Sequence, residues 1–227
     1  MKKILIIVTS NNVMGKSGKA TGIWAEELAA PYYAFIDAGL AVHLASPRGG
    51  AAPFDPSSVK AKGENQADVE RFLADPAAQA AIAATQSVSD ANMADYDAVF
   101  FPGGHGTMWD LPNDAAIASI VAHADASGKI IASVCHGAAG LVGAKRADGH
   151  AVVAGRRVNA FTDAEEAAAG LTDVVPFALE SRLRELGGKF EGAANWAPFV
   201  VVDGKLITGQ NPQSSALVAQ EVLRALA

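Results

Sequence analysis

The sequence has little cysteine, little positive charge and no long apolar run. A single cysteine, Cys135, cannot form an internal disulfide, which favours a reducing compartment and leaves the thiol to be explained by its own chemistry. Lys and Arg total 18 against 24 Asp and Glu, giving a formal net charge of -6, and no basic run could follow a phosphate backbone. We therefore expect neither a disulfide scaffold nor a nucleic-acid partner.

The apolar run after Lys2 and Lys3 is too short for the core of a signal peptide or for a membrane-spanning helix. It is instead typical of a buried first strand. We expect a cytoplasmic protein that does not associate with a membrane.

The length and the apolar pattern favour one α/β domain. The chain has 227 residues, 50% of them hydrophobic, which is enough to bury a substantial core. Short apolar runs alternate with glycine-rich turns and alanine-rich stretches of helical spacing, which is typical of βαβ units in a parallel sheet. The pattern predicts strands at 3–9, 41–46, 98–102 and 130–134, helices at 23–38 and 113–127, and an insert over about 49–84 within a single domain, 1–227.

The last third of the chain has a different pattern. A β-rich run at 151–158 predicts a strand pair or ribbon, and helices are predicted from about Asp163 and over 175–186. Asp203-Gly204 lies between two apolar runs and predicts a two-residue hairpin. A final helix is expected from Pro212 to the C-terminus, because proline suits the first helical turn.

Cys135 follows the predicted strand at 130–134 and precedes His136 and several small residues. A side chain on such a strand-to-helix turn is lifted to the carboxyl edge of the sheet, where open α/β sheets bind ligands. A helix that begins just after Cys135 would lower the pKa of the thiol. A lone cysteine is more often a small core residue, but His136 and the turn favour a nucleophile here.

A second glycine-rich turn, residues 103–106, follows the strand at 98–102. Neighbouring parallel strands end at the same edge, so this turn should lie beside Cys135 and could offer backbone N–H groups to an oxyanion. Gly104 is the candidate donor, together with the N–H of His136. The alternative is a tight strand-to-helix connection with no chemical role.

These motifs together resemble the ThiJ/PfpI superfamily, and within it the large glyoxalase III and stress-chaperone branch. The resemblance covers almost the whole chain. It implies a flavodoxin-like α/β sandwich, in which helices cover both faces of a mostly parallel sheet, and a homodimer. It rests on the turn at 103–106, the elbow at Cys135, Glu27 after Thr21-Gly22, Phe161-Thr162-Asp163 with Glu166, and the run 208–212.

The resemblance also implies roles for individual residues. Cys135 would be the nucleophile and His136 the histidine of a Cys-His-Glu triad, while Glu166 would orient His136 and Glu27 would share a hydrogen bond with the sulfur. To the oxyanion and substrate-binding part of the site we assign Gly104, His105 and Trp24.

The residues alone leave other roles open for these carboxylates. The run 163–166 has the spacing of a capping box, in which Glu166 would close a helix N-terminus, and Glu165 could be a solvated charge. Glu26 and Glu27 are adjacent on a helix, so only one can face inward, and the resemblance favours Glu27.

Other kinds of site are less well supported. The run 10–17, SNNVMGKS, lacks the first glycine of a phosphate-binding loop. A glutamine amidotransferase would need a downstream His-x-Glu, yet no histidine follows His150. We expect no metal, because the five histidines show no paired ligand spacing, and we expect His123 and His150 to face solvent. The three tryptophans, Trp24, Trp109 and Trp196, could form an aromatic rim or simply pack.

The leading hypothesis is a cofactor-free, glutathione-independent glyoxalase that converts methylglyoxal or a similar 2-oxoaldehyde to a 2-hydroxy acid through a hemithioacetal on Cys135. One alternative is a stress-related holding chaperone, with an apolar surface around residues 77–84. Another is a cysteine-dependent amidase, peptidase or deglycase. An oxidation-sensing thiol is a further chemical option.

Overall fold

The computed structural model describes residues 1–227 and is organised around one seven-stranded sheet. The strand order is β3-β2-β1-β4-β5-β9-β8, and only β8 runs antiparallel to its neighbour. This is the flavodoxin-like, mostly parallel sheet that the sequence predicts. The strands are β1 (Lys3–Ile7), β2 (Ala41–Ser46), β3 (Gln86–Ser87), β4 (Ala98–Phe101), β5 (Ile130–Val134), β8 (Val200–Asp203) and β9 (Leu206–Gly209).

Helices cover both faces of this sheet because both faces of its central strands are apolar. In β1, Ile4 and Ile6 point to the face covered by α1 (Ala25–Asp37) and α8 (Ser215–Leu226). Leu5 and Ile7 point to the opposite face, against α5 (Ala115–Ala126). All four side chains are fully buried, so the sheet separates two apolar cores.

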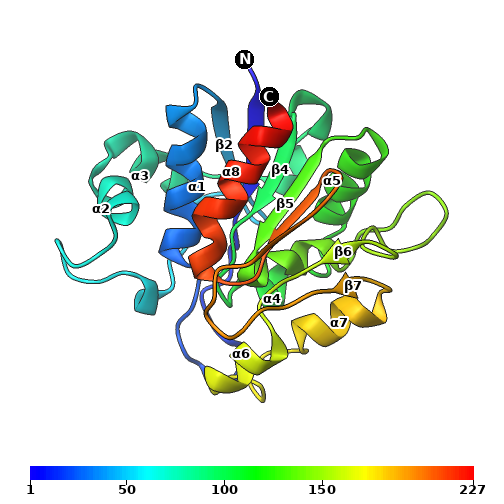
Figure 1. Ribbon diagram of the computed structural model, residues 1–227. Helices are drawn as coiled ribbons and strands as arrows, with labels where there is room; N and C mark the ends of the chain where they lie inside the picture. Colours follow the sequence, from blue (N-terminus) through cyan, green and yellow to red (C-terminus); the bar gives the residue numbers. More distant parts are fainter.

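The insert region contains two short helices, α2 (Ala67–Ala74) and α3 (Pro76–Ala83), beside α1 (Figure 1). The ring of Phe72 packs edge-on against Tyr32 of α1 at 5.2 Å between centroids. The large side chain of α3, Ile82, is buried, so the surface of this helix offers alanine methyl groups rather than a broad apolar patch. The division into one domain with an insert stays a prediction.

The prediction for 151–158 is wrong. Only β6 (Arg157–Val158) is a strand there, and it pairs in parallel with β7 (Lys189–Phe190) in a separate small sheet. Val152 and Val153 are buried through a turn that Gly155 continues with a φ of 78°. Their β-branched side chains serve the core without forming a strand.

The other elements of the last third follow the pattern more closely. The β8–β9 hairpin turns at Asp203-Gly204 as predicted. Helix α6 (Asp163–Ala168) is present, but α7 (Leu179–Glu185) begins later than expected. Pro176 disfavours helical geometry at Val175, the first residue of the predicted helix, and the extended backbone of Ala178, the N-cap, sets the start of the helix at Leu179. A 3-10 turn at Pro212–Ser214 precedes α8, and no helix of the structure has the length and hydropathy needed to cross a bilayer.

The carboxyl ends of β4 and β5 bring two loops into direct contact. The short helix α4 (Thr107–Asp110) follows β4, and a 3-10 helix, Cys135–Leu141, follows β5. Both chain termini lie at the opposite end of the sheet from α4 and α6 (Figure 1). A Cβ atom on Gly137 would lie 2.1 Å from the carbonyl oxygen of Phe101, so only glycine allows this approach.

Replacing Gly137 with alanine therefore tests how closely the two loops must approach. We expect Gly137→Ala to lower the free energy of unfolding by about 2 kcal/mol or more, because the methyl group must displace backbone. The control is Gly192→Ala, at an exposed position whose added Cβ would have no neighbour nearer than 3.5 Å. Chemical denaturation measures both, and equal stability of the two variants would contradict the packing argument.

Candidate active site

Cys135 ends β5 in a strained conformation. Its φ is 56°, in the left-handed region that non-glycine residues avoid at a cost of about 1–3 kcal/mol. The residue is only 3% exposed, yet it lines a cavity of about 390 Å³. The strand-to-helix elbow thus presents the sulfur to an enclosed space rather than to open solvent.

The cavity gathers most of the predicted site residues. Glu166 is the exception, because it lies behind the histidines and contacts them. No lysine or arginine lines the cavity, whereas Glu26 and Asp55 do. The predicted residues along the wall are Trp24, Glu27, Gly104, His105, Cys135 and His136.

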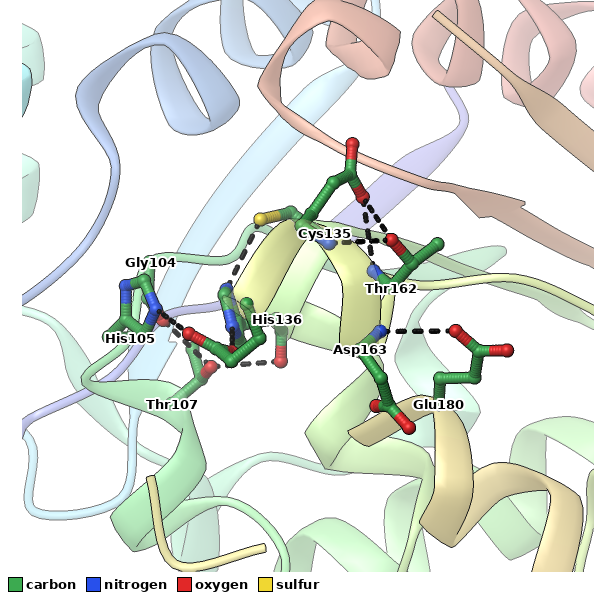
Figure 2. Close-up of polar contacts among 10 residues, drawn as sticks. Gly104, His105, Thr107, Cys135, His136, Thr162, Asp163 and Glu180 are labelled. Carbon is green, nitrogen blue, oxygen red and sulfur yellow. Dashed lines mark hydrogen bonds and ion pairs between the residues drawn. The ribbon is translucent and has the colours of Figure 1, made fainter. Parts of the chain in front are cut away.

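His136 connects the sulfur of Cys135 to Glu166, and Figure 2 shows the contact between its ring and the sulfur. Its Nδ1 lies 3.3 Å from Cys135 Sγ, and its Nε2 lies 2.7 Å from Glu166 Oε2. His105 Nε2 lies 2.8 Å from the other carboxylate oxygen, Glu166 Oε1. Burial opposes ionisation of Glu166, but the two histidine hydrogen bonds outweigh it and lower its pKa to about 2. The carboxylate therefore accepts from both rings, which fixes their protons on Nε2.

His136 stays neutral at physiological pH. Its ring contacts that of His105, at 4.0 Å between centroids, and that of Phe161, at 4.5 Å. Burial and the neighbouring His105 lower its pKa to about 4, although Glu166 favours the charged form. Its Nδ1 lone pair consequently faces the sulfur and is free to take a proton.

The pKa of the Cys135 thiol is raised, and the expectation of a lowered pKa is wrong. Burial is the largest cause, and Glu27 adds to it once its own carboxyl group is ionised; together they exceed the opposing effect of the His136 backbone N–H. The 3-10 helix after Cys135 does not compensate for the loss of water. The resting sulfur is a thiol and needs a base before it can attack.

Glu27 is the inward-facing member of the Glu26–Glu27 pair and is 0% exposed. Its Oε2 accepts the Gly103 N–H at 2.7 Å. Burial raises the pKa of Glu27 to about 8, although the adjacent Cys135 side chain and the Gly103 N–H favour the ionised form. At neutral pH this residue is a protonated acid beside the sulfur.

Gly104 lies where no side chain fits. Its φ is 102°, and an added Cβ would lie 2.2 Å from the Gly22 carbonyl oxygen. The Gly104 N–H donates to no backbone carbonyl, so it is available to a ligand. Thr107, which sequence reasoning missed, fixes this loop: its hydroxyl lies 2.8 Å from the Gly104 carbonyl and 2.9 Å from that of His136 (Figure 2).

The capping box lies one residue earlier than the sequence suggests. Thr162 is the N-cap of α6, and Glu165 reaches back to it. Glu165 is 0% exposed, so the alternatives of a solvated Glu165 and a capping Glu166 are both wrong. Because α6 places consecutive side chains about 100° apart, Glu166 can face the histidines while Glu165 faces the core.

Two of the three tryptophans line the cavity, and three of the five histidines lie on the surface. Trp196 lines the cavity together with Trp24, whereas Trp109 lies near Gly15, outside it. Solvent-exposed histidines occur at His43, His123 and His150, as predicted for the last two.

Only one group of side chains has the composition of a metal site. The ligand atoms of His105, His136 and Glu166 lie within 4.8 Å of one another. Both Nε2 atoms already donate to the carboxylate, so a metal would have to displace these protons. The donor set fits a hydrogen-bonded triad better than a cation site.

A cysteine at a strained elbow and a neutral histidine line one cavity, and an ionised glutamate lies behind the histidine. This is the arrangement expected of a cysteine-nucleophile site on an α/β fold. The profile of the DJ-1/PfpI family matches residues 19–225, and the chain belongs to this family.

Two curated relatives match this chain over nearly its whole length. Glyoxalase 3 of Candida albicans is 32% identical over 99% of this chain and 98% of the relative. A glutathione-independent glyoxalase of Saccharomyces cerevisiae is 28% identical with the same coverage. Among solved structures, the 24 kDa rapid encystment protein of Francisella tularensis is 41% identical over 100% of both chains, with a TM-score of 0.96. Glyoxalase III of Candida albicans has a TM-score of 0.90 at 30% identity, over 99% of this chain and 97% of that one.

The raised pKa of Glu27 predicts a pH-dependent stability. A carboxyl group that titrates near 4.5 when unfolded and near 8 when folded binds its proton in the native state between these values. Its contribution to stability is present below pH 4.5 and is lost as the pH rises toward 8. The free energy of unfolding of Glu27→Gln should therefore rise relative to wild type by on the order of 3 kcal/mol between pH 5 and 7.5.

Urea denaturation at several pH values measures this difference. The exposed Glu64 supplies the control, Glu64→Gln, which should follow the wild-type pH dependence. A difference between Glu27→Gln and wild type that stays constant from pH 5 to 7.5 would show that Glu27 is ionised in the native protein.

Proposed function

We propose that the protein is a glutathione-independent glyoxalase that converts methylglyoxal, or a related small 2-oxoaldehyde, to the 2-hydroxy acid. The observation that carries the proposal is the 3.3 Å approach of Cys135 Sγ to His136 Nδ1 beside a cavity of about 390 Å³. The absence of lysine and arginine from the wall suits a neutral substrate. The names of the two curated relatives support the same reaction.

The first step forms a carbon–sulfur bond. His136 Nδ1 takes the thiol proton and Cys135 adds to the aldehyde carbon, C1, of the substrate. The aldehyde oxygen becomes an oxyanion and then takes the thiol proton from His136 Nδ1, which gives a hemithioacetal and leaves the imidazole neutral for the next step. The backbone N–H groups of Gly104 and His136 are the candidate donors to this oxyanion.

The second step moves hydrogen from C1 to C2. A base removes the C1 proton to give an enediol, and C2 is then reprotonated, so C1 is oxidised while C2 is reduced. His136 is the candidate carrier, with Glu166 holding its Nε2 proton. The protonated Glu27 can supply the ketone oxygen with a proton and then take back the proton that the C1 hydroxyl loses as the thioester carbonyl forms. No external oxidant or reductant enters this step.

The third step releases the product. The second step leaves a thioester between Cys135 and the 2-hydroxy acid. Water attacks this thioester, the carbon–sulfur bond breaks, and the thiol and the free acid form. The net reaction adds one water molecule to the 2-oxoaldehyde, which yields lactate from methylglyoxal.

Cysteine-dependent hydrolysis of amides or glycated groups remains the runner-up, because it would use the same elbow and the same base. The holding-chaperone alternative has less support: the large exposed apolar side chains are scattered along the chain, at Met1, Val13, Ile36, Trp196, Val202 and Leu217. We also propose that the protein forms a homodimer, as the family resemblance implies.

Lactate formation from methylglyoxal without glutathione tests the proposal. Cys135→Ala should reduce kcat/KM to below about one thousandth of wild type, because the nucleophile is lost. Glu166→Gln should lower kcat about 100-fold, because an amide cannot accept from both histidines.

Glu180→Gln is the matched control for the glutamate variant. Glu180 accepts the Asp163 N–H at the start of α6 but does not contact the histidines (Figure 2), so the variant should retain near wild-type turnover. An unchanged rate in Cys135→Ala would end the glyoxalase proposal. Hydrolysis of amide substrates without lactate formation would favour the runner-up.

A further inference from the structure

We propose that Glu165 is a positioning residue that ties the Trp196 wall of the cavity to the helix that carries Glu166. The proposal deepens the proposed function and rests on it for the identity of the substrate. Glu165 itself lines no part of the cavity. It would act through the residues that it holds.

Four donors converge on the buried carboxylate of Glu165. Oε2 accepts the backbone N–H of Thr162 at 3.0 Å and the Thr162 hydroxyl at 3.1 Å. Oε1 accepts the backbone N–H of Trp196 at 2.8 Å and Nδ2 of Asn211 at 2.9 Å. One oxygen therefore fixes the start of α6, and the other fixes the loop at residue 196.

Trp196 needs such an anchor. Its φ is 65°, a conformation that a non-glycine residue adopts only when its surroundings hold it there. The residue is 44% exposed, so burial alone does not hold it. Asn211 supports the same loop, because its Nδ2 also donates to the Ala197 carbonyl at 2.9 Å.

The Trp196 ring connects the anchored loop to His136 through the ring of Phe161. Its centroid lies 5.6 Å from that of Phe161, which in turn lies 4.5 Å from that of His136. Trp196, Phe161 and His136 all line the cavity. A displacement of the Trp196 loop would therefore open the wall next to the histidine.

The donor set explains why a carboxylate is needed at this position. Glu165 has no cationic partner among the ion pairs of the structure. Its charge is stabilised instead by the hydrogen bonds from the four donors. A glutamine offers one oxygen and one NH2 group. Because glutamine is accepted in a capping box, its oxygen would stay with Thr162, and its NH2 group would face the donors of Trp196 and Asn211.

Glu165→Gln should thus release the Trp196 loop while it keeps the helix cap. We expect KM for methylglyoxal to rise about tenfold, the effect of one lost hydrogen bond to a charged group, with kcat within about threefold of wild type. Alkylation of Cys135 by iodoacetamide should become faster, because the wall beside the sulfur opens.

A double-mutant cycle with Trp196→Gly tests whether Glu165 acts through Trp196. Glycine tolerates the positive φ and removes the ring. In the Trp196→Gly background, Glu165→Gln should leave both KM and the alkylation rate unchanged, so the two substitutions should not be additive. Glu180→Gln, at the same helix end but without contact to Trp196, should behave as wild type in both assays.

Additive effects of the two substitutions, or a kcat loss with unchanged KM, would overturn the proposal. Should Glu165→Gln fail to fold, Glu165→Asp keeps the charge but is too short to reach both Thr162 and Trp196, and the same criteria apply. The alkylation assay needs no substrate. If the wild-type protein forms no lactate from methylglyoxal, only the proposed function is refuted. If the alkylation rate of Glu165→Gln equals that of wild type, the role of Glu165 is refuted.

Discussion

The hydrogen bond between Glu166 and His136 is the interaction on which the site depends. It keeps the ring proton on His136 Nε2, which lies 2.7 Å from Glu166 Oε2. The unprotonated nitrogen, Nδ1, therefore faces Cys135. The same carboxylate holds His105 through its second oxygen, and the His105 ring closes one face of His136. Loss of this carboxylate would free both rings at once.

Burial and hydrogen bonding together separate the pKa values of three neighbouring groups. Glu27 titrates near 8, His136 near 4 and Glu166 near 2. At neutral pH they are a neutral acid, a neutral base and an anion, which gives the cavity a proton donor and a proton acceptor together. The two glutamates differ because Glu27 is fully buried with a single backbone N–H to offset its burial, whereas Glu166 receives two imidazole N–H groups.

Sequence patterns predict the parts of the fold that local apolar runs define. The four central strands and the Asp203-Gly204 hairpin are present where the pattern places them, since each is a short run with a clear turn signal. The run containing Val152 and Val153 has a similar composition, yet it forms a turn in which both valine side chains are buried in the core. Composition alone cannot distinguish these two uses of valine.

The site could be predicted in its members but not in its electrostatics. The elbow at Cys135 is visible in the sequence, whereas the raised pKa of its thiol depends on burial and on Glu27, which lies far away along the chain. Glu165, and not Glu166, caps helix α6 because the cap begins at Thr162. Residue spacing by itself allowed a capping box that began at either Thr162 or Asp163. Trp196 carries no local signal for its contact with Glu165.

The acidic lining of the cavity has a consequence for what leaves it. An uncharged aldehyde meets no penalty on entry, but the proposed product is an anion among Glu26 and Asp55, with no lysine or arginine on the wall to hold it. Coulomb repulsion then favours departure of the acid once the thioester is cleaved. Accumulated lactate would compete poorly for the empty cavity, so the forward reaction would continue while its end product builds up around the protein.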